Sequence, residues 1–338
     1  MIRFLFSRAL ELVGLLFGLL VLTFLIANVA PGDPAGLVAG PNATPEMVET
    51  IRKEYGLDRP LYEQLVAYVG DVLQGDLGRS LSTTRDVVDE LAEALPKSLE
   101  LVLAALVIAV FGGVTLGVLS AVFRDSWIDH GMRIFAVSGV ALPLFWFGIL
   151  LQLYFAVRLG WLPVSGRIGF LADMPQPVTH ILLIDCIIGG KWETAREALG
   201  YLILPAIVLA FPSLAAITRI TRAEMIEVLG SDFVLGGRAH GLAPWRIVCR
   251  HALRNAMLPI LSLTALRYGW MLEGSILVET VFDWPGLGTM AVNAALLSDF
   301  KPVIGVTLVI GANFMIVNFL VDVAYAWLDP RLRQKGAR

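Results

Sequence analysis

The sequence predicts an all-helical integral membrane protein with six transmembrane helices. Three observations support this fold class. The 338 residues are 57% hydrophobic and only 16% charged, with a mean hydropathy of +0.74, whereas soluble domains carry about 25% charged residues. Several apolar runs are long enough to cross a bilayer. One long basic stretch, residues 236–259, interrupts the hydrophobic runs of the second half.

The first span is expected from about residue 9 to residue 30, within an N-terminal segment 1–30. Arg3 and Arg8 precede this apolar run. A secretory signal would also begin with basic residues, but this apolar core is too long for one. The run therefore predicts a first membrane-spanning helix whose N-terminus lies inside the cell.

Residues 31–98 are polar and acid-rich, and they predict a small helical cap outside the membrane. "PGDP" at 31–34 should break the first helix, and Pro45 and Pro60 occupy positions that suit helix starts. A third short helix is expected to end at Pro96. The segment is too short to bury a large core of its own.

The second and third spans are expected at about 99–123 and 134–157. Gly113 and Gly117 form a G-x-x-x-G pair, which permits close helix packing in lipid, although chance glycines in an apolar helix are an equal alternative. Pro143 lies inside the third span and should kink it.

The remaining spans are expected at about 200–220, 258–278 and 303–327, and they complete a transmembrane core at 99–327. A second outer segment, 161–199, contains a short apolar piece that suits an interfacial or re-entrant helix. A basic tail at 328–338 ends the chain.

The distribution of Lys and Arg predicts the orientation of the chain. These residues are denser in the N-terminus, the short loop near residues 124–133, the basic stretch and the tail than in the longer outer segments. Because positive charge favours the cytoplasmic side, both termini are expected in the cytoplasm. Cys186 and Cys249 then fall on opposite sides of the membrane, so no disulfide joins them.

The basic stretch predicts an amphipathic helix beside the membrane, begun by Pro244 after a glycine-rich turn at Gly236, Gly237 and Gly241. On a helix, an apolar face lies beside a cationic stripe. The face comprises Trp245, Val248, Cys249, Ala252 and Leu253, and the stripe comprises Arg246, Arg250 and Arg254. The stretch is either an ordinary interfacial loop or a docking element for another protein.

Catalytic and nucleotide-binding motifs are missing from the sequence. It has no G-x-x-x-x-G-K-[ST] phosphate loop and no H-E-x-x-H, C-x-x-C or G-x-S-x-G motif. The net charge of −3 offers no general field for nucleic acid. We therefore expect no enzyme activity, no metal site, no cofactor bound by this chain and no nucleic-acid partner.

Arg267 lies near the middle of the fifth span, where an unpaired charge is unfavourable. One interpretation places it in an aqueous pathway, where it attracts an anionic group such as a peptide carboxylate. The alternative is an ion pair with Glu273 or Asp322, although Glu273, six residues on, does not share its helix face.

Several stretches together resemble the membrane subunits of ABC importers, in particular the dipeptide/oligopeptide/nickel branch. The basic stretch "RAHGLAPWRIVCRHALRNAMLP" is similar to their cytoplasmic coupling loop, here 222–257. That loop often contains Glu-Ala-Ala before its glycine, where this chain has Leu235, Gly236 and Gly237. The other similar stretches are "PGDP", "GLDRPLYEQLVAYVGDVLQGDLGRSL", "ALPLFWFGILLQLYFAVRLGWLPVSG" and "ETVFDWPGLG".

The resemblance implies a permease subunit of the inner membrane. It would pair with a second homologous permease, dock two cytoplasmic ATP-binding subunits that hold ATP and Mg²⁺, and receive solute from an extracytoplasmic binding protein. ATPase docking is expected at Gly237, Arg238, Ala239, Gly241, Leu242, Trp245, Arg246 and Arg250. The substrate pathway is expected at Arg267 and Glu273. Either contact with the binding protein or a gate at the outer mouth is expected at Asp283, Trp284, Pro285 and Gly286.

Two other classes of function are compatible with a polytopic chain. An autonomous secondary transporter or channel would work without ATPase partners, but the sequence has no convincing internal repeat. A membrane enzyme would need a polar catalytic cluster. The sequence does not identify the solute, because in this branch the binding protein sets most of the choice.

Overall fold

The computed structural model describes residues 2–29, 43–54 and 58–328, which form two compact units. Unit 1 is drawn from Met1–Leu95 and Gly286–Arg338, and unit 2 is Pro96–Pro285. The described residues form helices and no strand, so the all-helical class is confirmed. The predicted "PGDP" break and the basic tail lie outside the described residues.

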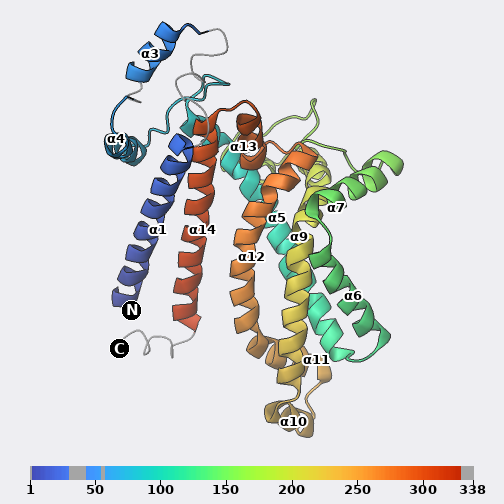
Figure 1. Ribbon diagram of the computed structural model, residues 1–338. Helices are drawn as coiled ribbons and strands as arrows, with labels where there is room; N and C mark the ends of the chain where they lie inside the picture. The colour runs from blue at the N-terminus through green and yellow to red at the C-terminus, as the bar shows by residue number, and fades with distance from the viewer. Residues whose placement is uncertain (1, 30–42, 55–57, 329–338) are drawn as a thin grey trace. The chain divides into compact units, whose positions relative to one another are not determined.

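Unit 1 contains two long helices that pack side by side, α1 (Ile2–Val29) and α14 (Phe300–Leu328) (Figure 1). The shorter α13 (Leu287–Leu296) also packs on α14. Because α1 and α14 run in opposite directions, the start of α1 and the end of α14 lie at the same end of this unit.

Two short helices of unit 1 begin where their prolines predict. The helix α3 (Pro45–Glu54) has Thr44 before it, whose hydroxyl accepts a hydrogen bond from the backbone N–H of Met47 at 3.3 Å. The helix α4 (Leu61–Leu73) follows Pro60, whose backbone is extended. Both predicted helix starts are confirmed.

The third predicted short helix does not end at Pro96. It is the beginning of α5 (Val87–Val122), which continues through this proline. Proline lacks an N–H group and removes one helix hydrogen bond, but burial holds the helix on either side of it. Val87 and Leu91 are buried in the core of unit 1, and Leu101 is buried in unit 2. Tertiary packing therefore outweighs the local signal of the proline.

Unit 2 is built around α9 (Trp192–Leu229), a 38-residue helix that is buried along most of its length. The helices α6 (Trp127–Ala141), α7 (Leu144–Leu151) and α12 (Leu253–Phe282) pack against it (Figure 1). The predicted span at 200–220 is thus the middle of a longer helix.

The predicted kink at Pro143 is a sharp break. The chain turns by 111° between α6 and the pair formed by α7 and the π-helix η1 (Gln152–Arg158). Leu142 and Pro143 both have extended backbone, as expected because a residue before proline avoids the helical region.

The predicted close packing at Gly113 and Gly117 is also confirmed. Both glycines of α5 face α9, where a Cβ on Gly113 would lie 2.7 Å from Ile217 and one on Gly117 would lie 2.5 Å from Thr221. Larger side chains would overlap with α9, so the G-x-x-x-G pair sets how closely these helices approach.

The outer segment of unit 2 folds around the short helix α8 (Leu182–Ile188), which packs on α9. Buried Glu100 binds the guanidinium of Arg167 and accepts a hydrogen bond from the backbone of Leu183 at 2.9 Å. Thr179 donates two hydrogen bonds of 2.7 Å to Asp185. Burial raises the pKa of Asp185, but these hydrogen bonds outweigh it and lower the pKa below its ordinary value.

Within the described residues, three helices are long and apolar enough to cross a membrane: α5, α9 and α14. The bent pair of α6 with α7 and η1 makes a fourth if it counts as one span. The chain therefore has the helices of a membrane protein, and the count of six crossings stays a prediction.

Candidate functional site

The basic stretch becomes a compact segment between α9 and α12, which we call the coupling segment (residues 230–252). It contains α10 (Asp232–Ala239), the single turn α11 (Pro244–Arg246) and the π-helix η2 (Ile247–Ala252). Pro244 is at the start of α11, as predicted. The segment lies at one end of unit 2, where it reverses the chain from α9 into α12 (Figure 1).

Of the three glycines predicted to form a turn, only Gly241 does so. Gly236 and Gly237 lie inside α10, so that part of the prediction is wrong. Gly241 has a φ of +73° and its N–H donates to the carbonyl of Arg238, while the N–H of Leu242 donates to that of Gly237. These two hydrogen bonds form a Schellman cap, which favours glycine at the left-handed position.

The predicted apolar face of the coupling segment is wrong in part. Trp245 is 65% exposed and Cys249 is also exposed, whereas Ile247 and Ala252 are buried. The reason is the π-helix η2, whose wider turn moves the buried positions from a spacing of four residues to five. Hydrophobic periodicity assumes 3.6 residues per turn, so it could not identify Ile247.

The three arginines of the predicted cationic stripe are exposed, and the same segment exposes large apolar side chains. We call this set of exposed residues the arginine surface: Phe233, Leu235, Trp245, Arg246, Arg250 and Arg254. The guanidinium of Arg246 lies 5.5 Å from the ring centre of Trp245. Among the described residues, no carboxylate forms a salt bridge with these arginines. The patch therefore presents aromatic and cationic groups that are available to a partner.

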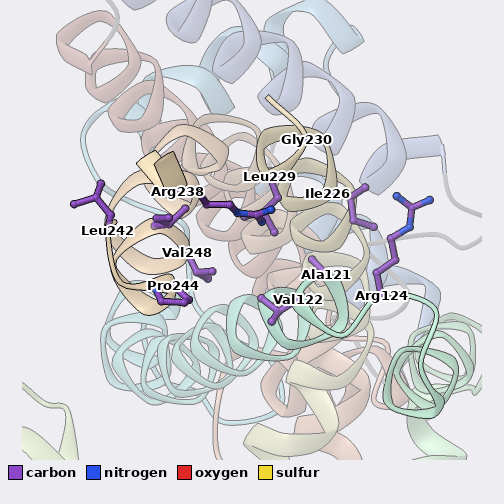
Figure 2. Close-up of a pocket in the computed structure, with 11 residues that line it drawn as sticks. Ala121, Val122, Arg124, Ile226, Leu229, Gly230, Arg238, Leu242, Pro244 and Val248 are labelled. Carbon is purple, nitrogen blue, oxygen red and sulfur yellow. The ribbon is translucent and has the colours of Figure 1, made fainter. Parts of the chain in front are cut away.

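A cavity of about 550 Å³ lies behind the coupling segment (Figure 2). Arg238 extends into it toward Leu229, whereas Arg124 points away from the coupling segment. The cavity separates the coupling segment from the ends of α5 and α9 on this side. Its walls are Ala121, Val122, Arg124, Ile226, Leu229, Gly230, Arg238, Leu242, Pro244, Ile247 and Val248.

A buried ion pair ties α6 to α9 close to this cavity. Asp129, which is fully buried, accepts hydrogen bonds from Arg222 at 2.6 and 2.7 Å, from Ser120 at 2.5 Å and from the backbone N–H of Asp125 at 3.1 Å. Arg222 is seven residues before the end of α9. The sequence placed Asp129 in a surface loop and gave no sign of this cluster.

Arg267 lies half-buried on α12, and Glu273 is exposed on the same helix. Among the residues whose side chains are described, no carboxylate lies within ion-pair distance of Arg267; the side chain of Asp322 is outside this set. A cation on the neighbouring helix, Arg219 of α9, lies near enough to Arg267 to repel it. Nothing in the sequence pattern indicated this neighbour.

The turn after α12, residues 283–286, is partly buried. Trp284 is 1% exposed, donates a hydrogen bond from its indole N–H to the carbonyl of Lys97 at 2.9 Å, and has the guanidinium of Arg167 5.9 Å from its ring centre. Asp283, in the left-handed conformation, and Pro285 are exposed. Trp284 and the buried Gly286 therefore support the turn, and Asp283 and Pro285 form its surface.

Comparison with known proteins matches the chain to two family models. Residues 113–334 match the binding-protein-dependent transport system inner membrane component, and residues 1–102 match the N-terminal part of such membrane components. The probable D,D-dipeptide transport system permease protein DdpB of Escherichia coli (strain K12) is 42% identical over 98% of this chain and 97% of its own length. The di/tripeptide transport system permease protein DppB of Pseudomonas aeruginosa (strain UCBPP-PA14) is 40% identical over 99% and 100%.

One solved structure has the same fold. A chain of the MetNI methionine ABC transporter in inward-facing conformations aligns with a TM-score of 0.50 at 15% identity, covering 71% of this chain and 96% of that one. At this identity the similarity concerns the fold alone.

Proposed function

This chain belongs to the family of binding-protein-dependent transport system inner membrane components, and we propose that it is a permease subunit of an ATP-driven importer of peptides or similar small solutes. It would form half of a pathway through the inner membrane, with a second homologous permease as the other half. An extracytoplasmic binding protein would deliver the solute. Two cytoplasmic ATP-binding subunits would hold ATP and Mg²⁺, because this sequence has no phosphate loop of its own.

The arginine surface carries this proposal. Trp245, Arg246 and Arg250 are exposed beside one another, and none of these arginines pairs with a carboxylate of the described residues. Tryptophan and arginine are enriched where proteins bind one another. An ATPase subunit that offers carboxylates around an apolar groove would suit them. Arg238 and Ala239 would extend the contact, while Gly237, Gly241 and Leu242 hold the turn that presents it.

The connections of the coupling segment indicate how ATP would drive transport. Its two ends continue directly into α9 and α12. Closure of the ATPase subunits would displace the segment and therefore both helices. The Asp129–Arg222 pair would pass the displacement to α6 and to the break at Pro143, so that the pathway opens to alternate sides.

The membrane arrangement follows from the same proposal. We expect six crossings, formed by α1, α5, the bent pair of α6 and α7, α9, α12 and α14. Residues 31–98 would lie outside the cell membrane, 99–327 would form the permease core, and 328–338 would be a cytoplasmic tail. Both termini and the coupling loop at 222–257 would face the cytoplasm, in agreement with the density of basic residues.

Contact with the binding protein would involve Asp283 and Pro285, because these residues of the outer turn are exposed. The buried residues Trp284 and Gly286 would hold the turn that presents them. The pathway would include Arg267, whose charge lacks a counter-ion among the described side chains, and Glu273, which is exposed on the same helix.

The proposal is tested by Gly241→Trp in the assembled importer. No atom lies within 4 Å of a Cβ at Gly241, so the indole would project from the docking face. The φ of +73° adds a backbone cost of about 1–2 kcal/mol. Gly190→Trp is a matched control, since Gly190 has a φ of +67° and equally open surroundings on the outer side of unit 2.

We expect Gly241→Trp to reduce ATP hydrolysis stimulated by the loaded binding protein roughly tenfold, as the loss of a central interface contact does. Gly190→Trp should keep the stimulated rate. Equal stimulation in the two variants would rule out docking at the coupling segment. Solute uptake by the chain alone in vesicles, without ATPase subunits, would instead favour an autonomous transporter.

A further inference from the structure

Two arginines of unit 2 lie at nearly the same level on neighbouring helices, Arg219 on α9 and Arg267 on α12. Gly274 of α12 packs against Leu209 of α9, where an added Cβ would lie 3.4 Å from the leucine Cδ1. These helices pack together and run in opposite directions, because the coupling segment reverses the chain (Figure 1). Arg219 is ten residues beyond Leu209, and Arg267 is seven residues before Gly274, in both cases toward the coupling segment.

The two positions therefore differ by three residues along the helix axis, or about 4.5 Å at 1.5 Å per residue. At this separation along the axis the two like charges are near enough to repel each other. Arg219 is exposed and Arg267 is half-buried. The pair thus forms a small, positively charged patch on the α9–α12 layer, about 15 Å from the last residue of α9.

Neither arginine has a counter-ion among the described side chains, and this distinguishes them from two partly buried arginines of the same unit. Arg222, 22% exposed, is paired with Asp129, and Arg167, 12% exposed, is paired with Glu100. Two neighbouring cations without a carboxylate repel each other, and charge at membrane depth is unfavourable unless it contacts water or an anion. An anion from outside unit 2 would therefore be favoured at this patch.

We propose that Arg219 and Arg267 together bind the carboxylate of the transported solute as it passes through the membrane. This inference rests on the proposed function and deepens it. Arginine binds carboxylates through two parallel N–H···O hydrogen bonds, and two arginines at the same level of neighbouring helices can both bind one carboxylate. The patch lies toward the coupling segment, so it would contact the solute after its release from the binding protein. The phosphate of an acidic lipid offers similar chemistry, and the experiment separates the two.

The test uses the complete importer without its binding protein, in a phosphate-free maltoside detergent. Binding of alanyl-alanine and of its C-terminal amide is followed by saturation-transfer NMR. We expect the amide, which lacks the carboxylate, to bind roughly tenfold more weakly. Arg219→Gln and Arg267→Gln should each weaken the binding of alanyl-alanine by a similar factor and leave the binding of the amide unchanged. Arg219→Lys and Arg267→Lys should keep part of the preference for the carboxylate over the amide.

Arg196→Gln is the matched control, because Arg196 is an exposed arginine near the outer end of α9; it should bind both probes as the unmodified protein does. Equal binding of the two probes by the unmodified importer, or an unchanged preference in both glutamine variants, would overturn the proposal. The proposal is also overturned if the variants bind both dipeptide probes normally but no longer bind phosphatidylglycerol in nanodiscs. That result would identify the patch as a lipid site. When the loaded binding protein is then added to the same importer preparations, stimulation of their ATP hydrolysis reports separately on the proposed function.

Discussion

The carboxylate of Asp129 holds three parts of unit 2 together, so its removal has a calculable effect. It accepts hydrogen bonds from Ser120 at the end of α5 and from Nε and Nη2 of the Arg222 guanidinium on α9. Asp129→Asn keeps the shape of the side chain, removes its charge and replaces one acceptor oxygen by a donor. Arg222 then loses its counter-ion within a buried site.

Removal of one partner from a buried ion pair costs about 3–5 kcal/mol. Arg222 keeps 22% of its surface exposed, so water compensates in part and we expect the lower end, about 3 kcal/mol. A unit of 150–250 residues loses roughly 2–4 °C of melting temperature per kcal/mol, so the expected decrease is about 6–12 °C.

The measurement is thermal unfolding of the purified complex in detergent, with Glu93→Gln as the control. Glu93 pairs with Arg85 on the surface, where the two side chains are 58% and 49% exposed, so its loss should leave the melting temperature unchanged. The double variant Asp129→Leu/Arg222→Met should recover most of the loss, because no unpaired charge remains. The reasoning is refuted if Asp129→Asn unfolds at the same temperature as Glu93→Gln, or if the double variant is less stable than the single one.

Three further predictions concern other parts of unit 2. Gly117→Ala places a Cβ in contact with α9 and should destabilise the protein by about 1–3 kcal/mol. Gly131→Ala is the control, because its added Cβ meets no atom within 4 Å. Equal melting temperatures of the two variants would contradict the close packing of α5 on α9. Because the folded-state pKa of Asp185 is lowered, its contribution to the unfolding free energy should be complete above about pH 5 and be lost as the pH falls through the folded-state pKa. Asp185→Asn should remove this part of the loss of stability in acid. An Asp185→Asn variant whose stability depends on pH as in the unmodified protein would contradict this prediction. Maleimide should label the exposed Cys249 and not the buried Cys186, whose thiol pKa is raised by burial; rapid labelling of both would contradict the described burial.

Local rules predicted the parts of the fold that depend on backbone chemistry. Pro45 and Pro244 begin helices, Pro143 breaks one, and Gly241 takes the left-handed turn. Each of these effects comes from the residue itself, through a fixed φ, a missing N–H or a missing Cβ. They are therefore readable without knowledge of tertiary contacts.

Features that depend on tertiary packing were not predictable. The helix α5 continues through Pro96 because buried residues hold it on both sides, and Gly236 and Gly237 stay helical within α10. The π-helix η2 shifts the buried face to Ile247. No periodicity in one sequence reveals an extra residue in a helical turn.

The candidate site was likewise predicted in part. The sequence identified the arginine stripe and Arg267 from their unusual positions among apolar residues. It could not pair Arg267 with Arg219, or Asp129 with Arg222, because each pair joins helices that are distant in sequence. Charge at a given position is a local signal, whereas its counter-ion is a property of the fold.

The length of α9 has a mechanical consequence. Its 38 residues span about 57 Å at 1.5 Å per residue, which exceeds the roughly 30 Å of a bilayer's hydrocarbon core. Near its first turns, Glu197 binds the backbone of Gly169 in the outer segment, and near its last turns Arg222 binds Asp129. One continuous helix thus carries attachments near both of its ends, so a displacement of either end is transmitted along the same helix to the other.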